Sequence, residues 1–180
     1  NPKMKSTKAA SRYAKALLEL AIEQNKLEQV SADMRYLLEV NGETKDFQML
    51  LNSPIVKSDK KLQIFGELFD QFEKLTTLFI HQVTRNGREY MLPEIAQSYE
   101  RQLKAHKGIV PVTLITATAL DNTTRSNIIA KIQNDVKGQL EIHEQIDESL
   151  IGGFIVRMDD KQVDASVINQ FNNLKQRLTN

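Results

Sequence analysis

The chain has 180 residues, of which 41% are hydrophobic and 26% are charged, a composition typical of folded globular proteins. The formal net charge is +1 at pH 7, so the overall charge does not favour binding to nucleic acid or to an anionic membrane surface. The absence of cysteine excludes disulfides and thiolate metal sites, and no apolar run reaches the roughly 20 residues that span a bilayer.

The first part of the chain has the apolar spacing of successive amphipathic helices. Apolar residues that recur at i, i+3, i+4 and i+7 predict helices over residues 6–24, 27–40, 44–52, 58–69, 72–85 and 88–107. Asn41-Gly42 and Asn86-Gly87 are predicted stops, and Lys60-Lys61 is interpreted as a solvated helix face. Short connections between these helices predict an antiparallel six-helix bundle over residues 1–107.

The second part, residues 108–180, is richer in β-branched residues, which favour strands. We expect strands at residues 109–116, 140–146 and 154–158, and helices at 121–138 and 165–178. Turn-forming residues at 147–153 predict a hairpin between the last two strands. The predicted fold class is therefore mainly α, with the bundle followed by a small α/β domain in which a short sheet carries two helices.

Signals for catalysis, metal binding or cofactor binding are weak. His81, His106 and His143 lie far apart and show no metal-ligand spacing. The glycine pair Gly152-Gly153 precedes a predicted strand, so it offers no helix N-terminus for an anion. The sequence thus predicts no catalytic residue, no metal site and no cofactor.

The first and fifth predicted helices have wider apolar sectors than a single core contact needs. The first adds Ala9, Ala16 and Leu20 beside its main apolar face. The fifth carries apolar residues around more than half of its circumference, at Leu75, Leu78, Phe79, Ile80 and Val83. Two interpretations stay open: both helices are central in the bundle, or they border a groove that accepts an amphipathic helix from another protein.

Residues 146–154, Ile-Asp-Glu-Ser-Leu-Ile-Gly-Gly-Phe, closely resemble the C-terminal signature of the ATP synthase delta subunit, or OSCP, family. The segments Arg-Tyr-Ala-Lys-Ala-Leu at 12–17 and Arg-Asn-Gly-Arg at 85–88 match that family in order and spacing. The residues assigned to the signature, with a structural role, are Asp147, Leu150, Ile151, Gly152, Gly153, Arg157 and Asp164.

This resemblance implies a non-catalytic stator subunit that links the F1 head of the rotary ATP synthase to its peripheral stalk. The N-terminal bundle is implied to bind the N-terminal helix of an α subunit in a groove between the first and fifth helices. The C-terminal domain is implied to bind the b subunit. The contact residues implied for the groove are Tyr13, Ala14, Leu17, Ala21, Leu78, Phe79 and Val83.

The resemblance also implies one copy per complex, at the cytoplasmic face of the bacterial inner membrane, with no insertion into the bilayer. We expect a monomer when the protein is isolated. The lack of a long presequence favours a bacterial over a mitochondrial origin. The alternative is a helical adaptor or regulator that binds an amphipathic helix of a different partner, and binding of an α-subunit peptide separates the two.

Overall fold

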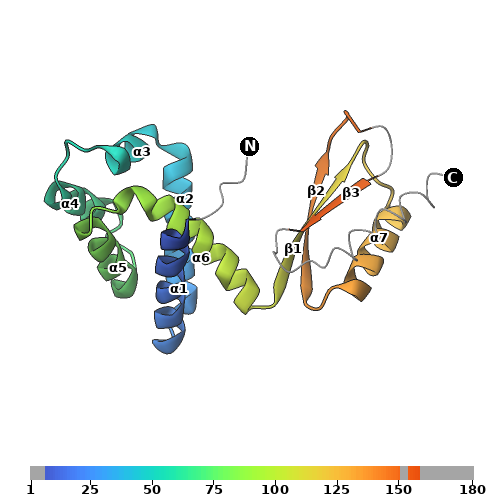
Figure 1. The fold of residues 1–180 in the computed structure, drawn as a ribbon, viewed down its shortest axis with the longest axis horizontal. Coiled ribbons are helices and arrows are strands. Elements are labelled where there is room, and N and C mark those ends of the chain that lie inside the picture. Colours follow the sequence, from blue (N-terminus) through green and yellow to red (C-terminus); the bar gives the residue numbers. More distant parts are fainter. Residues whose placement is uncertain (1–6, 151–153, 159–180) are drawn as a thin grey trace. The chain divides into compact units, whose positions relative to one another are not determined.

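The computed structural model describes residues 7–150 and 154–158 (Figure 1). The contacts divide the chain into two compact units, Asn1–Leu103 and Lys104–Asn180. The described residues are mainly helical, with one three-stranded sheet. The predicted helix at residues 165–178 lies outside the described residues.

The helical elements follow one another with short connections. They are α1 (Lys8–Glu23), α2 (Leu27–Glu43), α3 (Lys45–Asn52), α4 (Ser58–Leu68), α5 (Lys74–Arg85), a 3-10 helix η1 (Glu89–Met91) and α6 (Leu92–His106). Their ends follow local chemistry: the Thr7 hydroxyl accepts the Ala10 N–H at 3.2 Å and caps α1. Helix α2 differs from the prediction, because it passes through Asn41-Gly42 and ends only at Glu43. Gly42 has no left-handed backbone there, so it does not stop the helix.

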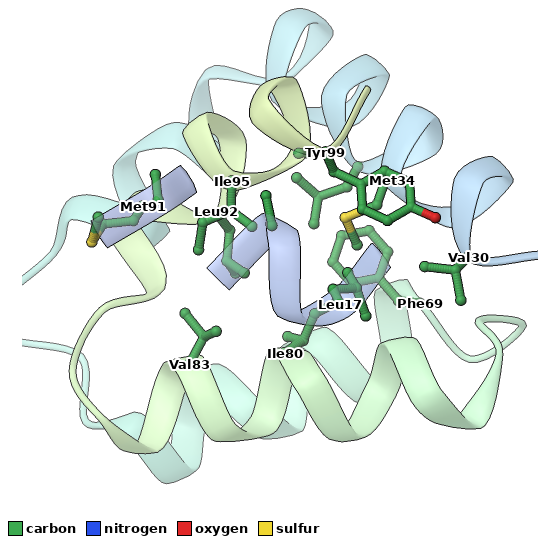
Figure 2. Close-up of a cluster of buried hydrophobic side chains, with 14 of the residues drawn as sticks. Leu17, Val30, Met34, Phe69, Ile80, Val83, Met91, Leu92, Ile95 and Tyr99 are labelled. Carbon is green, nitrogen blue, oxygen red and sulfur yellow. The ribbon is translucent and has the colours of Figure 1, made fainter. Parts of the chain in front are cut away.

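The core of the first unit collects one face of each of these helices. Figure 2 shows its members from α1, α2, α5, η1 and α6. Leu17 of α1 and Ile80 of α5 are almost fully buried, and so is Ile95 of α6. Tyr99 is fully buried as well, and its hydroxyl lies 3.2 Å from the Ser31 hydroxyl of α2, which satisfies both polar groups inside the core. Periodic apolar faces therefore close into a single contiguous core.

A buried ion pair joins three elements at one end of this core. The Lys61 ammonium lies 2.5 Å from a Glu89 carboxylate oxygen and donates to the Leu51 carbonyl at 3.3 Å. Lys61 is only 2% exposed, so the prediction that this residue belongs to a solvated helix face is wrong. The reason is tertiary: Glu89 comes from η1, which packs beside α3 and α5 and reaches Lys61 of α4, and a buried ammonium needs such a partner.

The second unit contains β1 (Ile109–Thr116), α7 (Asn122–Asp135), β2 (Gln139–Ile146) and β3 (Phe154–Met158). The strand order is β2-β1-β3, with β1 parallel to β2 and antiparallel to β3. The predicted hairpin between β2 and β3 is therefore wrong, because β1 lies between them. β1 is the strand with the most buried residues, which suits the central position, and α7 supplies the crossover that a parallel pair requires.

The core of the second unit lies between the sheet and α7. Val112 and Leu114 of β1 are fully buried against Ile128 and Ile132 of α7. The Asp121 carboxylate caps α7 by accepting the Thr124 N–H at 2.9 Å. Among the residues that the structure describes, this core has fewer buried members than that of the first unit.

Candidate docking surface

The residues predicted to line the groove fall into two groups by exposure. Tyr13 and Phe79 are partly buried, and Leu78 is 57% exposed. The other predicted contacts are fully buried in the core of the first unit, namely Ala14, Leu17, Ala21 and Val83. While this core stays closed, a partner has access only to the first group.

Two apolar stripes flank the buried faces of α1 and α5. Ala9, Tyr13, Ala16 and Leu20 share one side of α1, because residues three and four apart face the same way on a helix. Ala9 and Tyr13 pack against the core, whereas Ala16 is exposed and Leu20 is 40% exposed. The stripe is therefore rooted in the core and open to solvent along the helix.

The stripe on α5 has the same construction. Leu75 and Phe79 pack against the core, and Leu78 beside them projects into solvent. The rings of Tyr13 and Phe79 meet edge to face, with centroids 6.1 Å apart, and so join the stripes of α1 and α5. The joined stripes, called the α1–α5 surface below, comprise Ala9, Tyr13, Ala16, Leu20, Leu75, Leu78 and Phe79.

Tyr13 is held in place by the turn that follows α5. The Arg88 guanidinium lies 5.8 Å from the centre of the Tyr13 ring. Arg88 Nη1 and Asn86 Nδ2 donate to the Tyr13 hydroxyl oxygen at 3.2 and 3.3 Å. A ring fixed in this way loses little conformational freedom when a partner covers it.

Gly87 gives that turn its geometry. Its φ of +67° is left-handed, and its N–H donates to the Thr84 carbonyl while the Arg88 N–H donates to the Val83 carbonyl. These two bonds form a Schellman motif, which ends α5 at the predicted Asn86-Gly87 stop. The same motif directs Arg88 back toward Tyr13 of α1.

The other end of α5 is tied to α2. The Glu73 N–H donates to Asp33 Oδ2 at 2.9 Å, and the Glu73 carboxylate pairs with Lys26 at 3.4 Å. Burial raises the pKa of Asp33 above its ordinary value, although its hydrogen bonds oppose that shift. Both ends of α5 are thus fixed, which keeps the α5 stripe in register with that of α1.

The residues that the structure describes were also compared with the requirements for metal binding and for a membrane span. No group of three or more acidic or histidine side chains there is arranged to hold a metal ion. Within the same residues, no helix has the length and apolar character needed to cross a bilayer. What the first unit does present is an apolar surface with fixed side chains.

Comparison with known proteins decides the family. The sequence profile of the ATP synthase delta (OSCP) subunit matches residues 9–178. The chain belongs to the ATP synthase delta (OSCP) family. It is 35% identical over 177 residues to the ATP synthase subunit delta of Cytophaga hutchinsonii, which covers 98% of this chain and 97% of that protein.

Relatives extend beyond bacteria. The mitochondrial ATP synthase peripheral stalk subunit OSCP of Bos taurus is 34% identical over 171 residues, covering 93% of this chain and 80% of that protein. A chain in the cryo-EM structure of the Toxoplasma gondii mitochondrial ATP synthase hexamer superposes with a TM-score of 0.66 at 25% identity, covering 97% of this chain and 99% of that one. The protein is accordingly a non-catalytic, structural subunit of ATP synthase, and the adaptor alternative is not favoured.

The OSCP signature at the C-terminal side is only partly described. The Asp147 carboxylate accepts the Ser149 N–H at 3.0 Å and its hydroxyl at 2.6 Å, which lowers the pKa of Asp147. The Leu150 N–H donates to the Asp147 carbonyl, so the signature begins as a turn after β2. Arg157 is exposed on β3 opposite Thr113. The remaining signature residues, Ile151, Gly152, Gly153 and Asp164, lie outside the described residues.

Sequence reasoning missed the contacts that orient Tyr13. Arg88 and Asn86 follow it by more than 70 positions, and no local pattern joins residues so far apart. The one usable signal was Asn86-Gly87, which predicts where α5 ends and therefore where the chain turns back. It does not predict which side chain that turn supports.

Proposed function

We propose that this subunit ties the F1 head to the peripheral stalk, with its first unit on the head and its second unit on the stalk. The first unit, as an antiparallel six-helix bundle, binds the N-terminal helix of an α subunit along the α1–α5 surface. The second unit binds the b subunit. One copy serves each complex, at the cytoplasmic face of the bacterial inner membrane.

The observation that carries this proposal is the pair of apolar stripes joined at Tyr13 and Phe79. Helix-binding grooves take apolar anchors that recur at i, i+3, i+4 and i+7, which matches an elongated surface between two helices. Leu78 and Leu20 are the most exposed of its large side chains. Fully burying a large apolar side chain contributes about 1.5–3 kcal/mol, and Leu78 and Leu20, which are already partly covered, contribute a part of that each.

A stator connector must resist the drag on the head and dissociate slowly, and it needs no catalytic group. Rotation of the central stalk drags the head around, so the head must be tied to the static part of the complex. Buried apolar anchors lower the dissociation rate more than they change the association rate. The fixed ends of α5 suit this task, because a surface that does not reorganise loses less free energy on binding.

Isothermal titration of the full chain with a peptide copy of the α-subunit N-terminus tests the proposal. We expect binding in the wild type and a loss of about tenfold or more in affinity for Leu78→Glu, which places a charge in the apolar surface. The control is Met49→Glu, at a 65% exposed apolar residue of α3 that is not part of this surface. Equal affinity for both variants, or no heat with the wild type, would contradict the assignment.

A further inference from the structure

A second recess lies on the first unit, away from the α1–α5 surface. It is a pocket of about 610 Å³ between the outer face of α2 and the connection from α4 to α5. Five residues of α2 between positions 32 and 39, the last residue of α4 and residues 69–72 of the connection contribute its lining, and none of them belongs to the α1–α5 surface. This recess, the α2 pocket, has no role in the docking proposed above.

Three aromatic rings form its apolar part. Phe69 and Phe72 stack with centroids 4.5 Å apart, and Tyr36 meets them edge to face at 6.3 and 6.0 Å. Tyr36 stays 47% exposed although it is one of the larger apolar side chains of the unit. Of the three rings, Tyr36 is therefore the most accessible to a group that enters the pocket.

The charged side chains of the pocket are mainly acidic. Asp33, Glu39 and Asp70 contribute three carboxylates, against the single guanidinium of Arg35. Arg35 Nε donates to the Ser31 carbonyl at 3.4 Å, back along its own helix. Among the residues that the structure describes, neither Glu39 nor Asp70 forms an ion pair.

The geometry points to a binding site for a Lys or Arg side chain carried on an amphipathic segment of another protein. The cation lies against the Tyr36 ring, with Glu39 and Asp70 at the rim, and the apolar neighbours of the cation cover the partly exposed Phe72. Aromatic faces and carboxylates both attract a cation, and their combination disfavours an acidic segment. The pocket volume is ample for one long basic side chain together with apolar neighbours.

The probe for this proposal is an amphipathic peptide of about 15 residues, long enough to form a helix, with two arginines within its apolar face. A matched peptide has glutamine in place of both arginines. Amide resonances of the full-length protein are followed by NMR during titration. We expect shifts concentrated at residues 32–39 and 68–72, with binding of the glutamine peptide at least threefold weaker.

Protein variants separate the charges from the ring. Glu39→Gln with Asp70→Asn alters two exposed side chains, so the fold is retained, and we expect affinity to fall about threefold to tenfold. Tyr36→Leu keeps an apolar side chain and should weaken binding about twofold to fivefold. Glu19→Gln removes one carboxylate of α1, outside the pocket, and should leave binding unchanged.

Three results would overturn the proposal: equal affinity of the arginine and glutamine peptides, wild-type affinity of the Glu39→Gln/Asp70→Asn variant, or shifts located on the α1–α5 surface. Failure of this site leaves the α1–α5 surface untouched, since the two share no lining residue. A mutant of the α1–α5 surface, Leu78→Glu, should bind the arginine peptide as the wild type does.

Discussion

Leu17 of α1 and Leu78 of α5 lie on helices that contact each other, yet Leu17 is fully buried and Leu78 is 57% exposed. Lysine shows the same contrast: the side chain of Lys61 is 2% exposed in its pair with Glu89, and that of Lys15 is 69% exposed in its pair with Glu19. Interior and surface therefore use the same residue types differently. Inside, a side chain stabilises the unit; outside, it is available to a partner.

Lys61 should give the largest effect on stability. Lys61→Ala leaves Glu89 buried and charged, with its second carboxylate oxygen already lacking a hydrogen-bond partner among the described residues. We expect a loss of about 3–5 kcal/mol in the free energy of unfolding, measured by urea denaturation with far-UV circular dichroism. Lys15→Ala, at the exposed pair, should cost less than about 0.5 kcal/mol.

The double variant Lys61→Met with Glu89→Leu separates charge burial from packing. Because it removes both charges and keeps side-chain volume, it should recover much of the stability that Lys61→Ala loses. A double variant as unstable as Lys61→Ala would mean that the geometry of the pair, and not its unpaired charge, stabilises this end of the core.

The leucine comparison should give the next largest effect. Leu17→Ala opens a cavity in the core and should cost about 3 kcal/mol or more. Leu78→Ala should cost less than about 1 kcal/mol and should instead weaken binding of the α-subunit peptide. Urea denaturation and titration calorimetry on both variants measure the two effects. A destabilised Leu78→Ala that binds normally would reverse the roles given to the two residues.

How far the sequence predicts this structure depends on how local each signal is. The helical period placed α1 to α6, because one turn of helix brings nearby residues onto one face. It predicted a wide apolar sector on α1. It could not predict that Leu17 is buried and Leu20 exposed, because the neighbouring helices determine which part of the sector is covered. Lys61 was misplaced for a related reason: Glu89 is 28 residues away, and no local pattern links them.

The sheet shows the same limit. Turn formers at 147–153 predict a hairpin, yet β3 lies on the opposite side of β1 from β2. Strand order depends on which strand buries most surface, and β1 has Val112, Leu114 and Ile115 buried. The strands that compete for the central position are far apart in sequence, so the residues of one turn do not predict which of them takes it.

Two glycines offer a smaller and sharper test. Gly87→Ala forces a left-handed φ on a residue with a Cβ, although the space around it is open, and should cost about 1 kcal/mol. Gly42→Ala lies inside α2 with open space and should stabilise the unit by about 0.5–1 kcal/mol. Thermal unfolding of both variants measures the difference. Gly87→Ala should also weaken α-subunit peptide binding, because Arg88 and Asn86 orient Tyr13 from that turn.

The smallest expected effect is the change of unfolding free energy with pH. Its sign differs between a partly buried carboxylate and a more exposed one. Burial raises the pKa of Asp33 above 3.8, so the folded state holds this proton more tightly than the unfolded state. Its contribution to stability is greatest below 3.8 and is lost as pH rises through the folded pKa. The Lys104 ammonium, 2.6 Å away, and then His143 lower the pKa of Glu141 below 4.5.

The stability that Glu141 contributes is therefore present above 4.5 and is lost as pH falls through its lowered pKa. Unfolding free energies of the wild type, Asp33→Asn and Glu141→Gln between about pH 3 and about pH 7 measure both linkages. The difference between wild type and Asp33→Asn should fall with rising pH, whereas the difference between wild type and Glu141→Gln should rise. Slopes of the same sign would show that burial does not govern Asp33, and that its hydrogen bond to the Glu73 N–H outweighs the loss of solvation.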